Sequence, residues 1–243
     1  MNISNYLKIA EGKINNKFFK TLLLAILSGM FLSFAAIGST VASTFIENYS
    51  VSKFMAAIVF PMGLILIILL KTELFTGNSL LIIPLLERNI NFKQLIKNLL
   101  IVYIGNIIGS LIVALLIAKT PLVNKIGDTF INIMNTKTSF DFMTALVLGI
   151  LCNFLVCMAV YLGTIVNTVV EKVIVIFIPI FLFIILSLEH SVANMFYLSI
   201  GYILDNTSSL STILINNLLP VTIGNVIGGM VFGTIIWYLR EQK

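Results

Sequence analysis

The run Glu189-His190-Ser191-Val192-Ala193-Asn194 interrupts an otherwise apolar segment of the chain. The apolar residues before it extend over Val173–Leu188, and those after it over Met195–Ile203. A helix needs about 20 apolar residues to cross a bilayer, so the second piece is too short to cross alone. The pattern predicts one membrane-spanning segment that is broken by a polar insert near the middle of the membrane.

A second segment of the chain has the same pattern. The insert Lys71-Thr72-Glu73-Leu74-Phe75-Thr76-Gly77-Asn78 separates the apolar run Phe54–Leu70 from the short run Ser79–Leu86. Four uninterrupted runs are also long enough to span a membrane: Thr21–Thr44, Leu95–Ala118, Phe142–Val166 and Leu218–Leu239. The sequence therefore predicts an all-α membrane protein with six transmembrane helices, of which the second and the fifth are broken.

The composition excludes most other classes of protein. Of the 243 residues, 59% are hydrophobic and 10% charged, and the mean hydropathy is +1.08, whereas soluble domains carry about 25% charged residues. The apolar runs are too long and continuous for a β-barrel. An intrinsically disordered chain would have a much lower hydropathy. A nucleic-acid-binding protein would carry clustered basic residues, so we expect no nucleic-acid partner. Cys152 and Cys157 are five residues apart in an apolar run, which favours buried inert thiols over a disulfide scaffold or a metal site.

An internal repeat relates the two halves of the chain. Ile104–Leu111 recurs as Ile223–Met230 with a shift of 119 residues, and Glu73 to Asn78 recurs as Glu189 to Asn194 with a shift of 116 residues. Each half holds three predicted spans, an odd number, so the second half must enter the membrane upside down, as in many transporters. We expect a single transmembrane domain over residues 1–243, with an amphipathic surface helix over 1–20 and the two repeats over 21–118 and 140–240. The repeated glycines follow a spacing that lets helices approach closely, and we expect a packing role for all four: Gly105, Gly109, Gly224 and Gly228.

The distribution of positive charge predicts the orientation in the membrane. With the N-terminus inside, the inner segments hold ten Lys and Arg residues: Lys8, Lys13, Lys17, Lys20, Arg88, Lys93, Lys97, Lys172, Arg240 and Lys243. The outer segments hold four: Lys53, Lys119, Lys125 and Lys137. Since positive residues concentrate on the cytoplasmic side, both termini should be cytoplasmic. The N-terminal apolar run is too long for a signal peptide.

Ionisable residues at membrane depth are costly unless they are paired or hydrated, so each one indicates function. Glu73, Glu189 and His190, the only histidine, occupy the two inserts, together with Lys71. Two broken helices that meet at a repeat interface imply a polar path, because free backbone groups at this depth need protein or water around them. We expect Glu73 and Glu189 to accept hydrogen bonds from these backbone N–H groups, with Asn78 and Asn194 in similar roles. His190 can donate a hydrogen bond or a proton near neutral pH.

Several strings of this sequence resemble the formate/nitrite transporter family. They are Glu73-Leu74-Phe75-Thr76, Gly149-Ile150-Leu151-Cys152-Asn153, Glu189-His190-Ser191-Val192-Ala193-Asn194-Met195-Phe196 and Pro220-Val221-Thr222-Ile223-Gly224-Asn225. The resemblance covers about residues 15 to 240. It implies an aquaporin-like protomer with its own pore, a homopentamer in the cell membrane, and small monovalent anions such as formate, nitrite and hydrosulfide as substrates. Because the sequence has no phosphate-binding loop and no cluster of metal ligands, we expect no cofactor and no metal.

The resemblance also implies roles for individual residues. Leu74, Phe75 and Thr76 fall on a mobile loop at the first break, and Thr76 on the threonine that hydrogen-bonds the central His190. Lys137 falls on a lysine of the outer vestibule that attracts anions, and Asn153 on a pore-facing asparagine. The apolar constrictions of the pore would be formed by Phe60, Leu64, Leu74 and Phe183. The alternative for each of these apolar residues is a role in packing alone. The alternative for Lys137 is a solvated position in a loop with no role in transport.

The residues before Leu74 distinguish this chain from formate-type members, which carry small residues and an aspartate there. Lys71-Thr72-Glu73 resembles the hydrosulfide branch, so the sequence predicts a hydrosulfide channel, with formate or nitrite as the alternative. A membrane-embedded enzyme is the alternative from another class, because His190 lies next to Ser191. Adjacent residues rarely face each other, and no catalytic serine motif is present. A purely structural membrane protein would have no reason to bury Glu73, Glu189 and His190.

Overall fold

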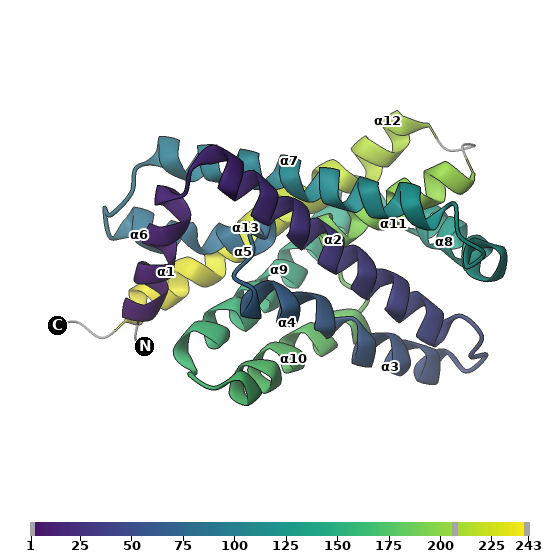
Figure 1. Cartoon of the computed structure of the whole chain (residues 1–243), viewed down its shortest axis with the longest axis horizontal. Coiled ribbons are helices and arrows are strands. Elements are labelled where there is room, and N and C mark those ends of the chain that lie inside the picture. Colours follow the sequence, from purple (N-terminus) through teal and green to yellow (C-terminus); the bar gives the residue numbers. More distant parts are fainter. Residues whose placement is uncertain (1–2, 206–208, 241–243) are drawn as a thin grey trace.

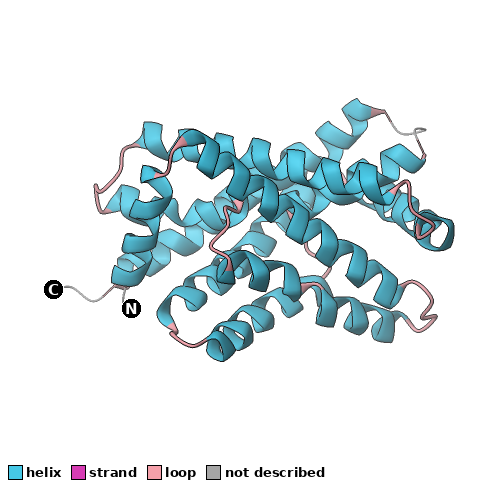
Figure 2. Ribbon diagram, viewed as in Figure 1, coloured by secondary structure: helices cyan, strands magenta, loops and turns pink. Residues whose placement is uncertain are grey.

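The structure is a computed structural model that describes residues 3–205 and 209–240. The regular elements of these residues are helices (Figures 1 and 2). The first half of the chain forms α1 (Ser4–Asn15), α2 (Phe18–Ser43), α3 (Tyr49–Val59), α4 (Pro61–Leu69), α5 (Phe75–Asn78), η1 (Ser79–Leu81), α6 (Ile82–Leu86) and α7 (Phe92–Ile117). The second half forms α8 (Val123–Thr138), α9 (Phe142–Ile165), α10 (Val169–Ile185), α11 (Ser191–Leu204), α12 (Leu210–Thr212), the π-helix η2 (Ile213–Leu218) and α13 (Leu219–Tyr238).

Most of the predicted spans are found as long apolar helices. Within the described residues, five helical stretches are long and apolar enough to cross a membrane: Phe18–Ser43, Tyr49–Leu69, Phe92–Ile117, Phe142–Ile165 and Leu210–Tyr238. The remaining predicted span, Val173–Leu188, falls on α10, which has 17 residues and so misses that length. The short apolar pieces form helices over Phe75–Leu86 and Ser191–Leu204.

The two predicted breaks are confirmed, and they have the same geometry. The second span stops at Leu69 and resumes at Phe75, and the fifth stops at Ile185 and resumes at Ser191. At the start of each break a non-glycine residue has a left-handed backbone, Lys71 with φ 52° and Ser187 with φ 54°. Such a backbone costs an L-residue about 1–2 kcal/mol. The same turn therefore occurs at corresponding positions of the two halves.

The repeated glycines allow the long helices of each half to cross at close range. A Cβ at Gly109 of α7 would collide with the carbonyl oxygen of Ile26 in α2, and a Cβ at Gly228 of α13 with that of Ile150 in α9. Gly224 meets Leu146 of α9 in the same way. A Cβ at Gly105 would lie 2.5 Å from the Cβ of Ala25. The predicted packing role of these glycines is confirmed.

The predicted N-terminal surface helix is present as α1, but its buried side covers protein rather than lipid. Tyr6 and Ala10 are buried where α1 packs on α7 and α9, and Lys13 reaches an ion pair inside the bundle. The second half has a comparable helix, α8, in the segment that the sequence suggested was an outer connection. Its buried residues Ile126, Phe130 and Met134 lie four residues apart and pack it on α11.

Candidate functional site

The two broken helices meet at one hydrogen bond. Thr76 in the first turn of α5 and His190 at the start of α11 are both buried, and Thr76 Oγ1 lies 2.9 Å from His190 Nε2. The residues are 114 positions apart in the sequence. The predicted pairing of Thr76 with His190 is therefore present, and it joins the two halves of the molecule at their centre.

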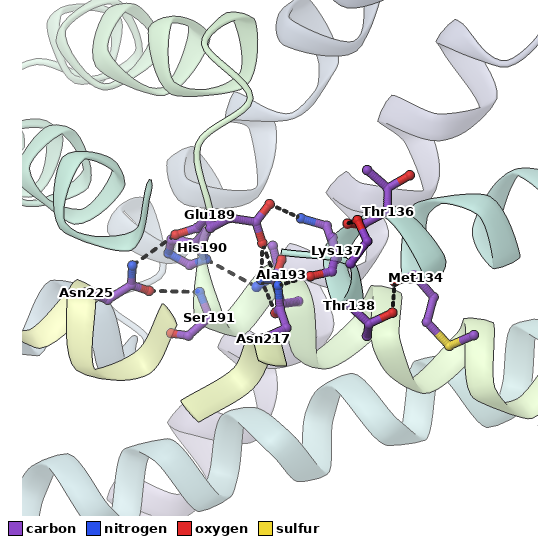
Figure 3. A network of polar contacts seen from close by, with 12 residues as sticks. Met134, Thr136, Lys137, Thr138, Glu189, His190, Ser191, Ala193, Asn217 and Asn225 are labelled. Carbon is purple, nitrogen blue, oxygen red and sulfur yellow. Dashed lines mark hydrogen bonds and ion pairs between the residues drawn. The ribbon is translucent and has the colours of Figure 1, made fainter. Parts of the chain in front are cut away.

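A second contact determines which nitrogen of His190 carries the proton. His190 is the N-cap residue of α11, and its Nδ1 accepts the backbone N–H of Ala193 at 3.2 Å, as Figure 3 shows. A nitrogen that accepts a hydrogen bond is unprotonated, so the neutral ring carries its proton on Nε2, which faces Thr76. A doubly protonated ring would lose the cap, because Nδ1–H would then face the N–H of Ala193.

Aromatic rings lie directly against this imidazole. The ring of Phe183 stacks on His190 with 6.0 Å between centroids and an angle of 20° between planes. Phe60 meets Phe183 edge to face at 5.5 Å. Leu64 and Leu74 are also buried in the same apolar core. The structure thus places Phe183 against His190 and Phe60 against Phe183, the two aromatic residues that the resemblance assigned to a constriction.

Each break also carries a buried carboxylate that is paired with a lysine. Glu189 accepts a hydrogen bond from Lys137 Nζ at 2.8 Å and from the side-chain amide of Asn217 at 3.0 Å (Figure 3). It also accepts one from the side-chain amide of Asn194 at 2.6 Å. The sequence prediction that Glu189 accepts from freed backbone N–H groups is wrong, since side-chain donors surround this carboxylate.

The first break repeats the arrangement, and the same correction applies to Glu73. Glu73 accepts from Lys13 Nζ at 2.9 Å and from Asn78 Nδ2 at 2.7 Å. Asn78 also donates to Asn98 at 2.8 Å, as Asn194 does to Asn217 at 2.7 Å. Lys13, Asn98 and Asn217 were not singled out from the sequence, because each lies on an element outside the inserts.

Two asparagines hold the free backbone groups of the breaks. Asn106 of α7 accepts the backbone N–H of Phe75 at 2.9 Å and donates to the carbonyl oxygens of Ala25 and Glu73. Asn225 of α13 accepts the N–H of Ser191 at 2.8 Å and donates to the carbonyls of Gly149 and Glu189. Asn106 and Asn225 thus accept the free backbone N–H groups of the breaks, the role that the sequence had suggested for Glu73 and Glu189. Their signal was visible in the repeated Ile-Gly-Asn strings.

Asn153 lies between the two breaks. Its amide donates to the carbonyl oxygens of Thr76 and Asn225, which belong to opposite halves. Its Oδ1 is buried and has no hydrogen-bond partner within the described part of the chain, and the same holds for Ser191 Oγ. Buried polar atoms are nearly always satisfied, so these two atoms are available to bind water or a small polar solute at the junction.

Lys137 is less exposed than a vestibule lysine was expected to be. It occupies the last turn of α8, its side chain is 15% exposed, and it pairs with Glu189 while lying 5.7 Å from the ring centre of Tyr197. Lys13 has the corresponding place in the first half, with a side chain 16% exposed. Each lysine therefore lies at the entrance to a break with its charge balanced by a glutamate.

Phe75 lies away from the imidazole. Its ring packs edge-on against Tyr103 of α7, with 4.8 Å between centroids, and it lines an apolar groove along that helix. Cys152 and Cys157 are buried and form no disulfide. In the described residues no group of three or more His, Cys, Asp or Glu side chains is close enough to hold a metal ion.

The comparison with known proteins agrees with this geometry. The family described as formate/nitrite transporter matches residues 2–239. The formate channel FocA of Escherichia coli (strain K12) is 33% identical, over 92% of this chain and 88% of the relative. A probable formate transporter of Methanothermobacter thermautotrophicus is 31% identical, over 95% of this chain and 92% of the relative.

Two solved structures have the same fold. A pentameric formate channel with formate bound superimposes with a TM-score of 0.82 and 28% identity, over 91% of this chain and 96% of the other. An ion channel of the FNT family superimposes with a TM-score of 0.87 and 26% identity, over 99% of this chain and all of the other.

Proposed function

This chain belongs to the formate/nitrite transporter family, and we propose that it is a homopentameric channel that carries formate or a closely similar weak-acid anion through a pore in each protomer. The family makes it a multi-pass membrane protein and a transport protein rather than an enzyme. The pentamer is proposed because the similar solved channel is pentameric. The cell membrane as its location, with both termini in the cytoplasm, remains a prediction from the charge count.

The observation that carries the proposal is the hydrogen bond between Thr76 and His190 at the meeting point of the two breaks. A small anion that leaves water for an apolar passage loses hydration worth on the order of 20 kcal/mol by an idealised calculation. The junction supplies a hydrogen-bond donor in compensation: the Nε2–H of His190 is donated to Thr76 Oγ1, which leaves the hydroxyl hydrogen of Thr76 free to donate to the anion. A weak-acid anion has a second route, because it can take up a proton and cross as the neutral acid.

Formate is preferred as substrate over hydrosulfide. The relatives described above are named as formate channels or a probable formate transporter, and one similar structure holds formate. The resemblance of Lys71-Thr72-Glu73 to the hydrosulfide branch has no support among them. Structurally, Lys71 is exposed and forms the left-handed turn of the break.

Flux into liposomes tests the proposal. Purified protein would be reconstituted, and uptake of formate, nitrite and hydrosulfide measured side by side under the same gradient. We expect formate to enter faster than into protein-free liposomes and at least as fast as the other two anions. If only hydrosulfide passed, the protein would still be an anion channel, but formate would be the wrong substrate. No passage of any of the three through an intact oligomer would contradict the proposal.

A further inference from the structure

Two apolar grooves adjoin each other on the outside of α7. The first, of about 560 Å³, has Phe18, Phe92, Lys93 and Lys97 along its rim, and the second, of about 480 Å³, extends toward Tyr103. Both grooves are lined by Ile96 and Leu100, so they form one continuous surface, which we call the α7 groove. No acidic side chain is among the described residues that line it.

The rim of the α7 groove is basic at one end. Lys93 and Lys97 are one helical turn apart at the start of α7, and both are exposed. Lys17 and Lys20, also exposed, flank Phe18 at the start of α2, which lies at the same end of the molecule (Figure 1). None of these four lysines has an ion-pair partner among the described residues, unlike Lys13, which pairs with Glu73.

This combination matches the chemistry of an anionic phospholipid. The exposed rings of Phe18 and Phe92 suit the level of the lipid headgroups, where aromatic residues concentrate. All four lysines belong to the predicted cytoplasmic set, and the cytoplasmic leaflet is the one rich in anionic lipid. We propose that the α7 groove binds one anionic phospholipid, with its phosphate between Lys93 and Lys97 and its acyl chains over Ile96 and Leu100.

The second half of the groove connects this site with the first break. Phe75, the first residue of α5, forms part of its wall, together with Tyr103, whose hydroxyl lies 3.0 Å from Thr222 Oγ1. An acyl chain in this part of the groove contacts Phe75 and therefore stabilises the segment that follows the break. Binding of the lipid does not depend on the proposed function, but an effect on flux does.

Lipid titration of the purified oligomer in neutral detergent tests the binding. Phosphatidylglycerol should raise the thermal midpoint and remain bound in native mass spectrometry, and phosphatidylcholine should do so much less. The double variant Lys93→Gln/Lys97→Gln should bind phosphatidylglycerol about thirtyfold more weakly. The matched control Lys119→Gln/Lys125→Gln removes two exposed lysines elsewhere and should bind like the wild type. Equal affinity in the two double variants would contradict the proposal.

A third variant separates binding in the groove from attraction to a basic surface. Leu100 is 58% exposed, so Leu100→Trp should fold while it fills the apolar floor and leaves both lysines in place. We expect it to bind phosphatidylglycerol more weakly, and glycerol phosphate, a headgroup without chains, to compete poorly. Unchanged binding in Leu100→Trp, or full competition by glycerol phosphate, would contradict the proposal that the lipid binds in the α7 groove.

A neighbouring protomer is the other possible occupant of the groove. A disulfide that forms between copies of Leu100→Cys upon oxidation in membranes would show that this face is a subunit contact, and would exclude the lipid. Absence of that crosslink, with phosphatidylglycerol still bound to the oligomer, is the result expected.

Discussion

The two ring nitrogens of His190 have different tasks, and substitutions can separate them. Asparagine can still cap α11, because its side-chain oxygen accepts a backbone N–H, but it cannot titrate. We expect His190→Asn to keep the oligomer and part of the flux, and to flatten the pH dependence of flux, because asparagine cannot pass a proton to the anion. His190→Phe should abolish flux, since it removes the donor and the proton carrier together. Anion uptake into liposomes over a pH series measures both.

A wild-type pH profile in His190→Asn would show that this histidine does not protonate the anion. Desolvation in the apolar passage would then be the better explanation for proton uptake. Size-exclusion chromatography of each variant checks that the oligomer is intact.

The ion pair of Lys137 with Glu189 changes what a lysine substitution reports. Lys137→Ala leaves a carboxylate that is 4% exposed without its partner, and breaking a buried pair from one side costs about 3–5 kcal/mol. We expect Lys137→Ala to lower the free energy of unfolding by an amount of that order. We also expect it to lower the flux, most strongly at low anion concentration. The double variant Lys137→Ala/Glu189→Gln should recover most of the stability but not the flux. Thermal unfolding and a concentration series at low salt give the two readouts.

Lys119→Ala is the matched control, because this exposed lysine has no ion pair in the described structure. An unchanged half-saturation concentration in the double variant would mean that Lys137 only balances Glu189 and attracts no anion.

At the residue scale, the sequence identified the groups at the breaks but not their partners. His190, Glu73 and Glu189 were found because ionisable residues at membrane depth are rare and costly, whereas Thr76 was found only through the resemblance to the family. Their partners Lys13, Asn106 and Asn225 come from other helices, and only the packing of those helices brings them together. A repeated asparagine indicates that a position matters, but it does not tell which backbone group its side chain contacts.

At the scale of elements, the close crossings of helices give the next prediction. Gly109→Ala places a methyl group against the carbonyl of Ile26, so α2 and α7 must move apart. Overpacking of this kind costs about 1–3 kcal/mol. We expect a lower thermal midpoint in detergent, with the same effect for Gly228→Ala in the other half.

Gly12→Ala is the control for this pair. A Cβ there has no neighbour within 4 Å, and alanine favours a helix by about 1 kcal/mol over glycine. Its midpoint should be equal to or above that of the wild type. A Gly109→Ala protein as stable as Gly12→Ala would show that the close crossing is not needed.

Continuous apolar runs predicted the long helices and the two breaks correctly, since the length of a bilayer leaves few alternatives. The helix α8 was missed for a related reason. Its mixed polar and apolar residues resemble a loop in a membrane protein, although Ile126, Phe130 and Met134 have helical spacing. The buried side of α1 could not be predicted either, because spacing alone does not tell whether lipid or protein covers an apolar face.

At the scale of the whole molecule, orientation can be tested directly. Lys13 and Arg240 of the inner set and Lys137 of the outer set are neutralised by ion pairs, which reduces the count of ten against four to eight against three. The excess on the inner side persists. We expect a reporter joined after Lys243, which lies outside the described residues, to be reached only from the cytoplasm. If a reagent added outside intact cells labelled that reporter, the orientation would be opposite to the one predicted.

The positions of α1, α6 and the end of α13 bring the first and last described helices to the same end of the molecule. These elements gather at one end of the molecule, where Glu87 joins Trp237 at 2.7 Å and Arg240 at 2.7 Å (Figure 1). A reporter placed after α13 should therefore also report the side of the membrane on which α1 lies.

The matched halves also determine the energy profile that a permeating ion experiences. On the pathway that we propose, an ion arriving from either side meets a lysine–glutamate pair and then an asparagine-held break. The symmetry is broken at the centre, because Leu74 at the N-cap position of α5 makes no side-chain hydrogen bond, whereas His190 at the N-cap of α11 accepts one. A profile that is almost its own mirror image gives currents of nearly equal size when the voltage is reversed. Any rectification in such a pore would originate mainly from one imidazole.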